Sequence, residues 1–367
     1  LYLIPNCVSA RVRLKLAGDA AAGLLQRWSE PLLALAESKS EDIGKMRPFL
    51  DRAWKLVLTN HAHDSVCGCS IDQVHRDMMN RFEQAQVLGE QLRHQAFAAL
   101  TVDCRELAQE KDDFTLTLFN PAFTPVEESV IFDIDLPTDY PACFHEGFRS
   151  QEVKSFVLED AEGNTVPYQR LRVTPVMNER SRVAKHCFIS DGPFARYTVA
   201  ANLSLPACGY TSLRVRPAER PVRVMGSLRT GPVAAENEHL AISVANNGSL
   251  TLTDKRTGEI YSDLLTFEDR SEIGDGWFHG ESVNDAPALS SATGAQVRVL
   301  HDGPEIVTFR IEVTLAVPKR YNWHAEAPVE ETVPLRIRSD VSLRRGARVV
   351  DVATTIDNVA EDHRLQL

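Results

Sequence analysis

The sequence predicts an α+β protein in which an antiparallel three-helix bundle is followed by antiparallel β-sandwich domains. Only three of the 19 prolines and three of the 15 phenylalanines precede residue 108, so helix breakers and strand-favouring aromatic residues are concentrated in the rest of the chain. Apolar residues recur every three or four positions before that point and in alternation after it. We expect a bundle over 1–107, a sandwich over 108–220 and a second sandwich over 221–367.

Three helices are expected in the first part of the chain. Apolar spacing places them at 9–36, 46–59 and 71–92, and Pro31 either kinks the first or stands in the first turn of a new helix. The third has the clearest amphipathic face, and Ser70 with Gln73 matches a capping box at its start. Short connections between the helices favour antiparallel packing.

Short alternating runs predict antiparallel strands from residue 114 onward. The clearest hairpin joins 240–244 to 250–252 through the turn Asn246-Asn247-Gly248. Two longer runs, 305–317 and 333–341, predict a further pair. The break between the two sandwiches is expected at 217–229.

Composition excludes several classes of function. The chain has 40 Lys and Arg against 51 Asp and Glu, a formal charge of -11, and no strong basic patch, which argues against a nucleic-acid partner. No run approaches the roughly 18 apolar residues of a membrane helix. Seven scattered cysteines, Cys187 among them, are unlike a disulfide framework and favour a reducing, cytoplasmic setting. The first residues show neither an initiator Met nor a signal-peptide pattern.

One segment between the second and third expected helices differs in kind from its surroundings. Residues 60–70 contain two histidines, an aspartate and two cysteines, which helix packing does not require. Four interpretations compete: the polar side chains satisfy helix ends; a structural zinc site forms; a cysteine acts as nucleophile; or one histidine is a single ligand of a catalytic metal, with Asp64 facing substrate. The zinc-site interpretation would use His63, Cys67, Cys69 and His75.

The same segment resembles the signature of the glycoside hydrolase family 38 α-mannosidases, especially their bacterial branch, which includes mannosylglycerate hydrolase. The run His61-Ala62-His63-Asp64-Ser65-Val66-Cys67-Gly68-Cys69-Ser70 carries the likeness most specifically. Further matching segments occur in the same order along nearly the whole chain: Ser9-Ala10-Arg11 with Lys15, Leu118-Phe119-Asn120-Pro121, Asn247-Gly248-Ser249-Leu250, Gly274-Asp275-Gly276, and Asp357-Asn358 with Asp362-His363-Arg364-Leu365.

The resemblance implies a role for two residues. His63 would be a ligand of one catalytic zinc ion, and Asp64 would accept hydrogen bonds from hydroxyls of a terminal mannose. It implies a retaining two-carboxylate mechanism on α-mannosides, mannosylglycerate among them. The nucleophile, the acid/base carboxylate and the other zinc ligands belong to an N-terminal α/β domain in this family, and no residue of this sequence matches them. The resemblance also implies a galactose-mutarotase-like super-sandwich that is incomplete here, so we expect a fragment.

Two rival functions remain open from the sequence. The stretch 268–279 places Trp277 beside carboxylates, an arrangement with which proteins stack on sugars, so a non-catalytic carbohydrate-binding sandwich on a helical bundle is one alternative. A structural zinc module is the other. His61 is expected to serve a helix end, and His75 and Asp77 to face solvent or the bundle. A homo-oligomer is left open, because a truncated β surface would favour association.

Overall fold

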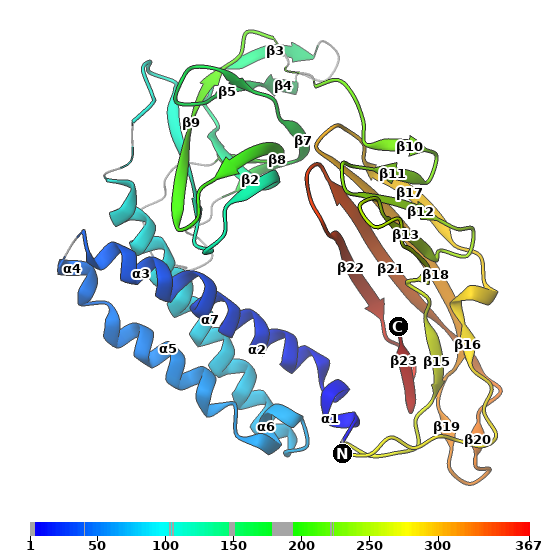
Figure 1. Cartoon of the computed structure of the whole chain (residues 1–367). Helices are drawn as coiled ribbons and strands as arrows, with labels where there is room; N and C mark the ends of the chain where they lie inside the picture. Colours follow the sequence, from blue (N-terminus) through cyan, green and yellow to red (C-terminus); the bar gives the residue numbers. More distant parts are fainter. Residues whose placement is uncertain are drawn as a thin grey trace.

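The computed structural model describes residues 4–39, 41–102, 104, 106–146, 151–177, 194–220, 222 and 224–367. Its helices precede its strands in the chain, as Figure 1 shows, and the strands pair antiparallel throughout the described sheets, which confirms the α+β class. No described helix is long and apolar enough to cross a membrane. Cys187 lies outside the described residues.

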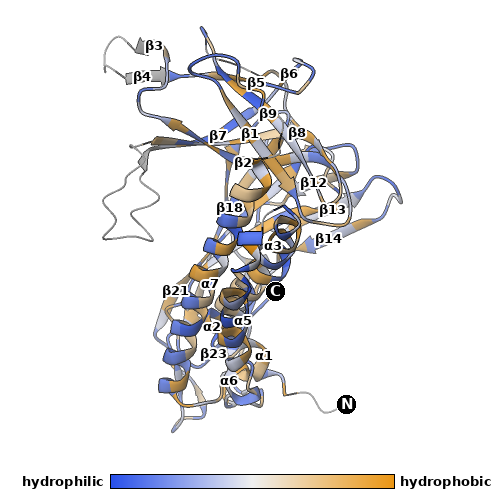
Figure 2. Cartoon of the chain, turned by 90° about the vertical axis from the view of Figure 1, so that its left-hand side faces the viewer, coloured by the Kyte–Doolittle hydropathy of each residue, from blue (hydrophilic) through white to orange (hydrophobic). Residues whose placement is uncertain are grey.

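The helical part consists of one long central helix and the helices that pack on it. Helix α7 contacts α2, α3 and α5, and the core between them is apolar. Figure 2 shows hydrophilic and hydrophobic stripes along these helices, as expected of an amphipathic bundle. The helices are α1 (Asn6–Ser9), α2 (Val12–Leu24), α3 (Glu30–Glu37), α4 (Glu41–Gly44), α5 (Arg47–Thr59), α6 (His63–Cys67) and α7 (Asp72–Thr101).

The first expected helix continues through Pro31 because a π-helical turn precedes the proline. Residues Leu25–Ser29 form a π-helical turn between α2 and α3, and Pro31 stands in the first turn of α3, where its missing N–H does least harm. The Ser29 hydroxyl donates to the Leu24 carbonyl at 3.1 Å and to the Gly89 carbonyl of α7 at 2.9 Å. The irregular turn is therefore fixed to the central helix.

The expected capping box at the third helix is wrong. Ile71 occupies the N-cap of α7 and no side chain caps the helix, while Gln73 donates to Asp77 one turn further on. Asp72 instead pairs with Arg11 at 2.6 Å across the bundle. The cap fails because the helix begins one residue later than the capping box requires, so that Ser70 precedes the N-cap; the helix then runs to Thr101, past its expected end at 92.

Two groups of sheets follow the bundle, each with its own apolar core. The first holds the sheets β1-β9-β5-β6, β2-β8-β7 and β3-β4. Its strands are β1 (Phe114–Asn120), β2 (Val126–Pro137), β3 (Ala142–Glu146), β4 (Gln151–Lys154), β5 (Phe156–Glu159), β6 (Thr165–Val166), β7 (Gln169–Met177), β8 (Phe194–Leu205) and β9 (Gly209–Pro217).

The second group contains the expected hairpin, in which Leu240 pairs with Asp254 and Val244 with Leu250. Its sheets are ordered β10-β11-β12-β13-β14, β16-β15-β23, β17-β18-β21-β22 and β19-β20. The strands are β10 (Arg229–Gly231), β11 (Ala234–Glu236), β12 (Leu240–Val244), β13 (Leu250–Asp254), β14 (Ile260–Leu264), β15 (Glu268–Ser271), β16 (Ala288–Leu289), β17 (Gln296–His301), β18 (Ile306–Pro318), β19 (Tyr321–Asn322), β20 (Ala327–Pro328), β21 (Thr332–Arg344), β22 (Val350–Asp357) and β23 (His363–Gln366). The domain limits at 107 and 220 stay predictions.

The two groups of sheets are joined by buried polar contacts. Glu305, 2% exposed, accepts a hydrogen bond from the Ser129 hydroxyl, and Gln169 donates to the Ile306 carbonyl at 3.0 Å. Arg344 donates to the Glu128 carboxylate and the Ser129 carbonyl, each at 2.8 Å. Because each buried polar group has a partner, the junction is held in one arrangement.

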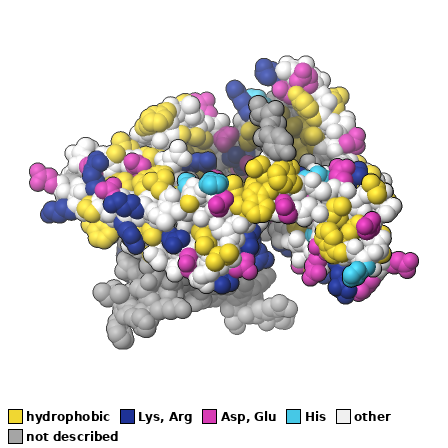
Figure 3. Space-filling view, turned by 90° about the horizontal axis from the view of Figure 1, so that it is seen from below, with side chains coloured by type: hydrophobic (Ala, Val, Ile, Leu, Met, Phe, Trp, Pro, Cys, Tyr) yellow, Lys and Arg dark blue, Asp and Glu magenta, His cyan; other side chains and the backbone are white. Residues whose placement is uncertain are grey.

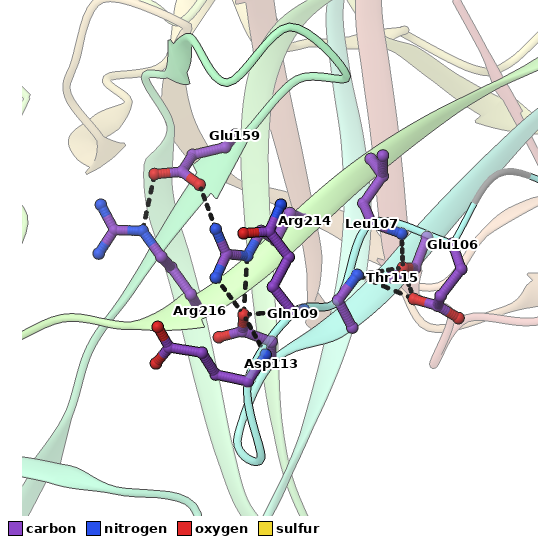
Figure 4. A network of polar contacts seen from close by, with 10 residues as sticks. Glu106, Leu107, Gln109, Asp113, Thr115, Glu159, Arg214 and Arg216 are labelled. Atoms are coloured by element: carbon purple, nitrogen blue, oxygen red, sulfur yellow. Dashed lines mark hydrogen bonds and ion pairs between the residues drawn. The ribbon is translucent and has the colours of Figure 1, made fainter.

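A second polar network ties the segment that follows α7 to the first sandwich. Figure 4 shows Arg214 between Asp113 and Glu159, with Arg216 donating to Glu159 at 2.7 Å. These ion pairs raise the pKa of Arg214. A surface hollow of about 870 Å³ lies beside the network, lined by both carboxylates and cations.

Candidate functional site

Helix α6 carries the two residues that the sequence singles out. His63 and Asp64 form the first turn of this helix and do not lie in an open loop. The Asp64 carboxylate is favourable there, at the positive end of the helix dipole. The preceding turn is anchored by Asn60, which is fully buried and donates to the Met78 carbonyl of α7 at 3.0 Å. Arg81 donates to the Asn60 side chain at 3.2 Å. The base of α6 is thereby fixed to the central helix.

The other end of α6 is fixed to the start of the chain. Gly68 closes the helix with a φ of +87°, a conformation that favours glycine, and a Cβ there would lie 3.2 Å from the Ala10 carbonyl oxygen. Arg11 donates to the Gly68 carbonyl at 3.0 Å, and Lys15 donates to the Cys67 carbonyl at 3.3 Å. The matching segments 9–11 and 60–70 are therefore in direct contact.

His63 and Asp64 point outward from this braced support. The His63 side chain is 90% exposed and that of Asp64 is 61% exposed, and His63 Nε2 lies 3.1 Å from Asp64 Oδ1. The Cys69 thiol lies 3.7 Å from the same oxygen, Asp64 Oδ1, and burial together with that carboxylate raises the pKa of Cys69. An imidazole and a carboxylate side by side on an accessible surface can take part in metal and hydroxyl binding.

A loop from the second sandwich meets this region. Residues 272–280 connect β15 towards β16, and Figure 1 shows this yellow-green loop running beneath the sheets to the start of α1. Asn6 is 7% exposed and donates from Nδ2 to the carbonyls of Asp275 at 2.8 Å and Phe278 at 2.9 Å. A Cβ added at Gly276 would lie 3.9 Å from the Cys69 Cβ. The loop therefore packs on the segment that follows α6.

Two carboxylates inside the loop hold its shape. Glu272 accepts hydrogen bonds from the backbone N–H groups of Gly274 and Gly280, both at 2.8 Å, and lies 2.5 Å from His279 Nδ1. Asp275 accepts from the N–H groups of Trp277 and Phe278, both at 2.8 Å. The pKa of Asp275 is lowered by these backbone hydrogen bonds, so its carboxylate stays charged near neutral pH.

The loop exposes aromatic side chains while its backbone is held. Trp277 is 42% exposed and Phe278 is 47% exposed. Seen from below, hydrophobic side chains gather where the helical and β parts meet, with histidine and acidic side chains on the same face (Figure 3). The loop therefore presents aromatic surface at the junction of the helical and β parts.

The other residues that the sequence suggested do not join His63 and Asp64 in a common site. His75 is 6% exposed in the bundle, neither of its ring nitrogens has a hydrogen-bond partner, and burial lowers its pKa. His61 is exposed at the end of α5. Within the described ranges, no group of three or more His, Cys, Asp or Glu side chains could hold a metal ion. His63, Cys67, Cys69 and His75 therefore do not form the structural zinc site that one interpretation requires.

Sequence reasoning missed Asn6 and Cys7. Both lie in a short segment without periodicity, so local sequence gave no signal for them. The hydrogen-bond partners of Asn6 and Cys7 lie about 270 residues later in the chain. The Cys7 thiol donates to the Gly276 carbonyl at 3.4 Å. Only the tertiary fold reveals these contacts.

The chain is similar to known proteins in both sequence and fold. Residues 5–100 match the α-mannosidase middle domain family. The chain is 27% identical, over 98% of its length, to a Halalkalibacterium halodurans protein named "Putative mannosylglycerate hydrolase", of which it spans 42%. It superposes on the crystal structure of an α-mannosidase from Enterococcus faecalis V583 with a TM-score of 0.85 and 27% identity, over 99% of this chain and 43% of that one.

A second solved structure agrees. A glycosyl hydrolase family 38 protein from Enterococcus faecalis matches with a TM-score of 0.84 and 26% identity, over 99% of this chain and 45% of that one. In fold, the chain is similar to parts of glycoside hydrolases. More narrowly, residues 5–100 match the α-mannosidase middle domain family, and the whole chain is similar to family 38 α-mannosidases, which confirms the resemblance. It spans less than half the length of these relatives.

Proposed function

We propose that this chain is part of a zinc-dependent, retaining α-mannosidase and that α6 contributes two side chains to its active site. The observation that carries the proposal is the pair His63 and Asp64, exposed side by side on a helix that is braced at both ends. The family relation supports the hydrolase class. Terminal α-mannosides, mannosylglycerate among them, are the proposed substrates, and the cytoplasm the proposed location.

One side chain of this chain, that of His63, could serve as one ligand of a zinc ion. Neutral imidazole is a common zinc ligand, and His63 is accessible enough to reach an ion held mainly by other residues. Because the chain spans less than half the length of the relatives it matches, we infer that the other ligands, the nucleophile and the acid/base carboxylate come from a part of the polypeptide outside this sequence. Bound zinc would supply Lewis-acid attraction for vicinal sugar hydroxyls.

The chain's own residues bind and orient the sugar in this proposal. The Asp64 carboxylate accepts hydrogen bonds from mannose hydroxyls, and its short distance to His63 keeps the two side chains in a common direction. Trp277 and Phe278 offer apolar surface to the non-polar face of a sugar ring. Orienting contacts of this kind lower the barrier by holding the scissile bond near the catalytic carboxylates.

The test uses the whole polypeptide of which this sequence is part. His63→Ala should lower bound zinc and lose at least a hundredfold in hydrolysis of an aryl α-mannoside. Asp64→Asn should retain zinc but lose activity, because an amide nitrogen cannot accept the sugar's hydrogen bonds. His61→Ala, two positions away and also exposed, is the matched control and should change neither quantity. Normal zinc content and activity in His63→Ala would overturn the assignment.

The exposed Trp277 favours one second candidate, a sandwich that binds carbohydrate without catalysis. This alternative expects the present chain alone to bind a mannoside saturably in the absence of zinc, and Trp277→Ala to abolish that binding. Isothermal titration of the chain with a mannoside in the presence of a chelator separates the two functions. Binding that requires both zinc and the remainder of the polypeptide favours the mannosidase.

A further inference from the structure

One strand of the second group of sheets is uncovered along its length. Strand β22 forms one border of the sheet β17-β18-β21-β22, and Figure 1 shows it in dark red beside β21. Among the described strands, only β21 pairs with it, and the pairing runs over eight residues without a register shift. Every residue of β22 except Val350 is exposed. The outer border of β22 is therefore open to a further strand.

One exposed face of β22 continues the apolar core. Val352 is paired with Val341 of β21. Ile356 is paired with Ile337 of the same strand, and residues directly opposite each other in antiparallel strands lie on one face. The two β21 residues are buried in the core, at 0% and 2% exposed, whereas the two β22 residues are each 43% exposed. The core face of the sheet is thus covered as far as β21 and uncovered at β22.

The opposite border of the same sheet is protected. Strand β17 has a register shift between Val299 and His301, and its Val297 and Val299 pack against the apolar core. Bulges, prolines and lysines are features with which proteins keep a free border from pairing, and β22 has none of them. Its two charged residues, Asp351 and Asp357, lie on the face away from the core. A strand of this composition is suited to pairing on both sides.

Length and charge favour one occupant for this border. The chain spans less than half the length of the relatives that it matches, so a longer polypeptide has further segments to offer. Two copies of β22 could join their apolar side chains in the antiparallel register that sets Val352 opposite Ile356. The same register sets Asp351 opposite Asp357, and like charges directly opposite destabilise a strand pair. Each copy would also carry a formal charge of -11.

We propose that a strand from the part of the polypeptide outside this sequence pairs with the outer border of β22 and covers its core-facing side chains. Backbone N–H and C=O groups of β22 that do not bond to β21 hold the added strand. The added strand has apolar side chains beside Val352 and Ile356, and neutral or basic side chains beside Asp351 and Asp357. This pairing rests on the longer polypeptide of the proposed function, but it requires neither zinc nor a mannoside.

Hydrogen exchange of β22 tests for the added strand. The present chain and the whole polypeptide are compared by mass spectrometry of a peptide spanning 350–357. Pairing should slow the exchange of this peptide in the whole polypeptide by about tenfold or more, because the N–H groups at the border gain partners. A peptide spanning 296–301, from the protected border strand β17, is the control and should exchange alike in both proteins. Slowing at 350–357 that is no greater than at 296–301 would overturn the proposal.

Substitutions on the two faces of β22 test whether the core face is covered. Val352→Lys places a charge where the added strand should lie, so the peptide 350–357 should exchange rapidly again in the whole polypeptide. The melting temperature of the present chain should change little, because Val352 is half exposed there. Ala353→Lys is the matched control on the other face, opposite Asp340, and should keep the slow exchange. Slow exchange in Val352→Lys would contradict covering of the core face.

Light scattering of the present chain tests the rival occupant. We expect a monomer whose exchange at 350–357 does not depend on protein concentration. A dimer whose formation slows this exchange would overturn the choice of occupant in favour of a second copy. Neither experiment measures zinc or hydrolysis, so a failure here leaves the proposed function standing. Conversely, normal zinc content and activity in His63→Ala would leave the pairing at β22 standing.

Discussion

Asn6 should control how firmly the loop 272–280 rests on the helical part. Its side chain donates two hydrogen bonds to loop carbonyls, each worth about 1 kcal/mol net. Its own Oδ1 is buried without a partner, so removing the side chain also removes an unsatisfied acceptor, which offsets up to about 1 kcal/mol. Asn6→Ala should therefore weaken loop docking by about 1 to 2 kcal/mol.

The assay is hydrogen exchange of the loop amides, followed by mass spectrometry of a peptide spanning 272–280. A loss of about 1 to 2 kcal/mol in local opening corresponds to roughly 5- to 30-fold faster exchange. Asn6→Asp should have a larger effect, because a carboxylate oxygen would face the carbonyls of Asp275 and Phe278 without a hydrogen to share. Melting temperature alone would not separate loop opening from unfolding of the bundle.

The matched control is Asn120, which is also buried and donates from Nδ2 to two carbonyls, those of Thr124 at 2.8 Å and Pro206 at 3.1 Å. Asn120→Ala should loosen the turn after β1 and leave the loop 272–280 unchanged. If both Asn6 variants exchange at the wild-type rate in this loop, the side-chain contacts do not hold it, and the reasoning from hydrogen-bond geometry fails.

Two other variants test the packing around the site. Gly274→Ala should disrupt the same loop and speed its amide exchange, because the added Cβ would lie 1.9 Å from the Phe278 carbonyl oxygen. Gly294→Ala is the control: no atom lies within 4 Å of its Cβ, so the exchange of the loop should not change. His75→Leu should reduce the loss of stability in acid. Since burial lowers the His75 pKa below its ordinary value, its contribution is present above about pH 6.5 and is lost as the pH falls towards the lowered pKa. Urea midpoints at pH 7.5 and 5.5 should therefore differ less in His75→Leu than in wild type, and an equal difference would contradict this origin.

The order of the elements could be predicted because it depends on local patterns. The third helix shows apolar residues at helical spacing, and its face is buried where the pattern predicts, at Met78, Phe82, Ala85 and Leu92. The hairpin around Gly248 follows from its turn residues and has the expected pairing. The failed cap at Ser70 shows the limit, since the helix begins one residue later, with Ile71 at the N-cap, and its first residue Asp72 pairs with Arg11 from a distant segment.

Part of the candidate site could be predicted from the sequence, and part could not. His63 and Asp64 stand out in sequence because their residue types are unusual for a segment between two helices, although their roles remain predictions. The support beneath them could not be predicted, since Asn6 and Cys7 bind a loop about 270 positions later. No periodicity links such residues, and a spacing of that size depends on how the sandwich sits against the bundle.

The contacts around α6 determine which of its side chains stay accessible. Arg11 and Lys15 hold the end of the helix, Asn60 holds its base, and Gly276 lies against Cys69. Glu272, which shapes the loop, is itself flanked by the segment 362–364, since its N–H donates to the Asp362 carbonyl at 2.8 Å. These contacts leave the side chains of His63 and Asp64 exposed on the outward side of α6. Under the proposed function, the missing ligands and carboxylates approach from that outward side, where a rigid base reduces the entropy lost when they meet zinc and sugar.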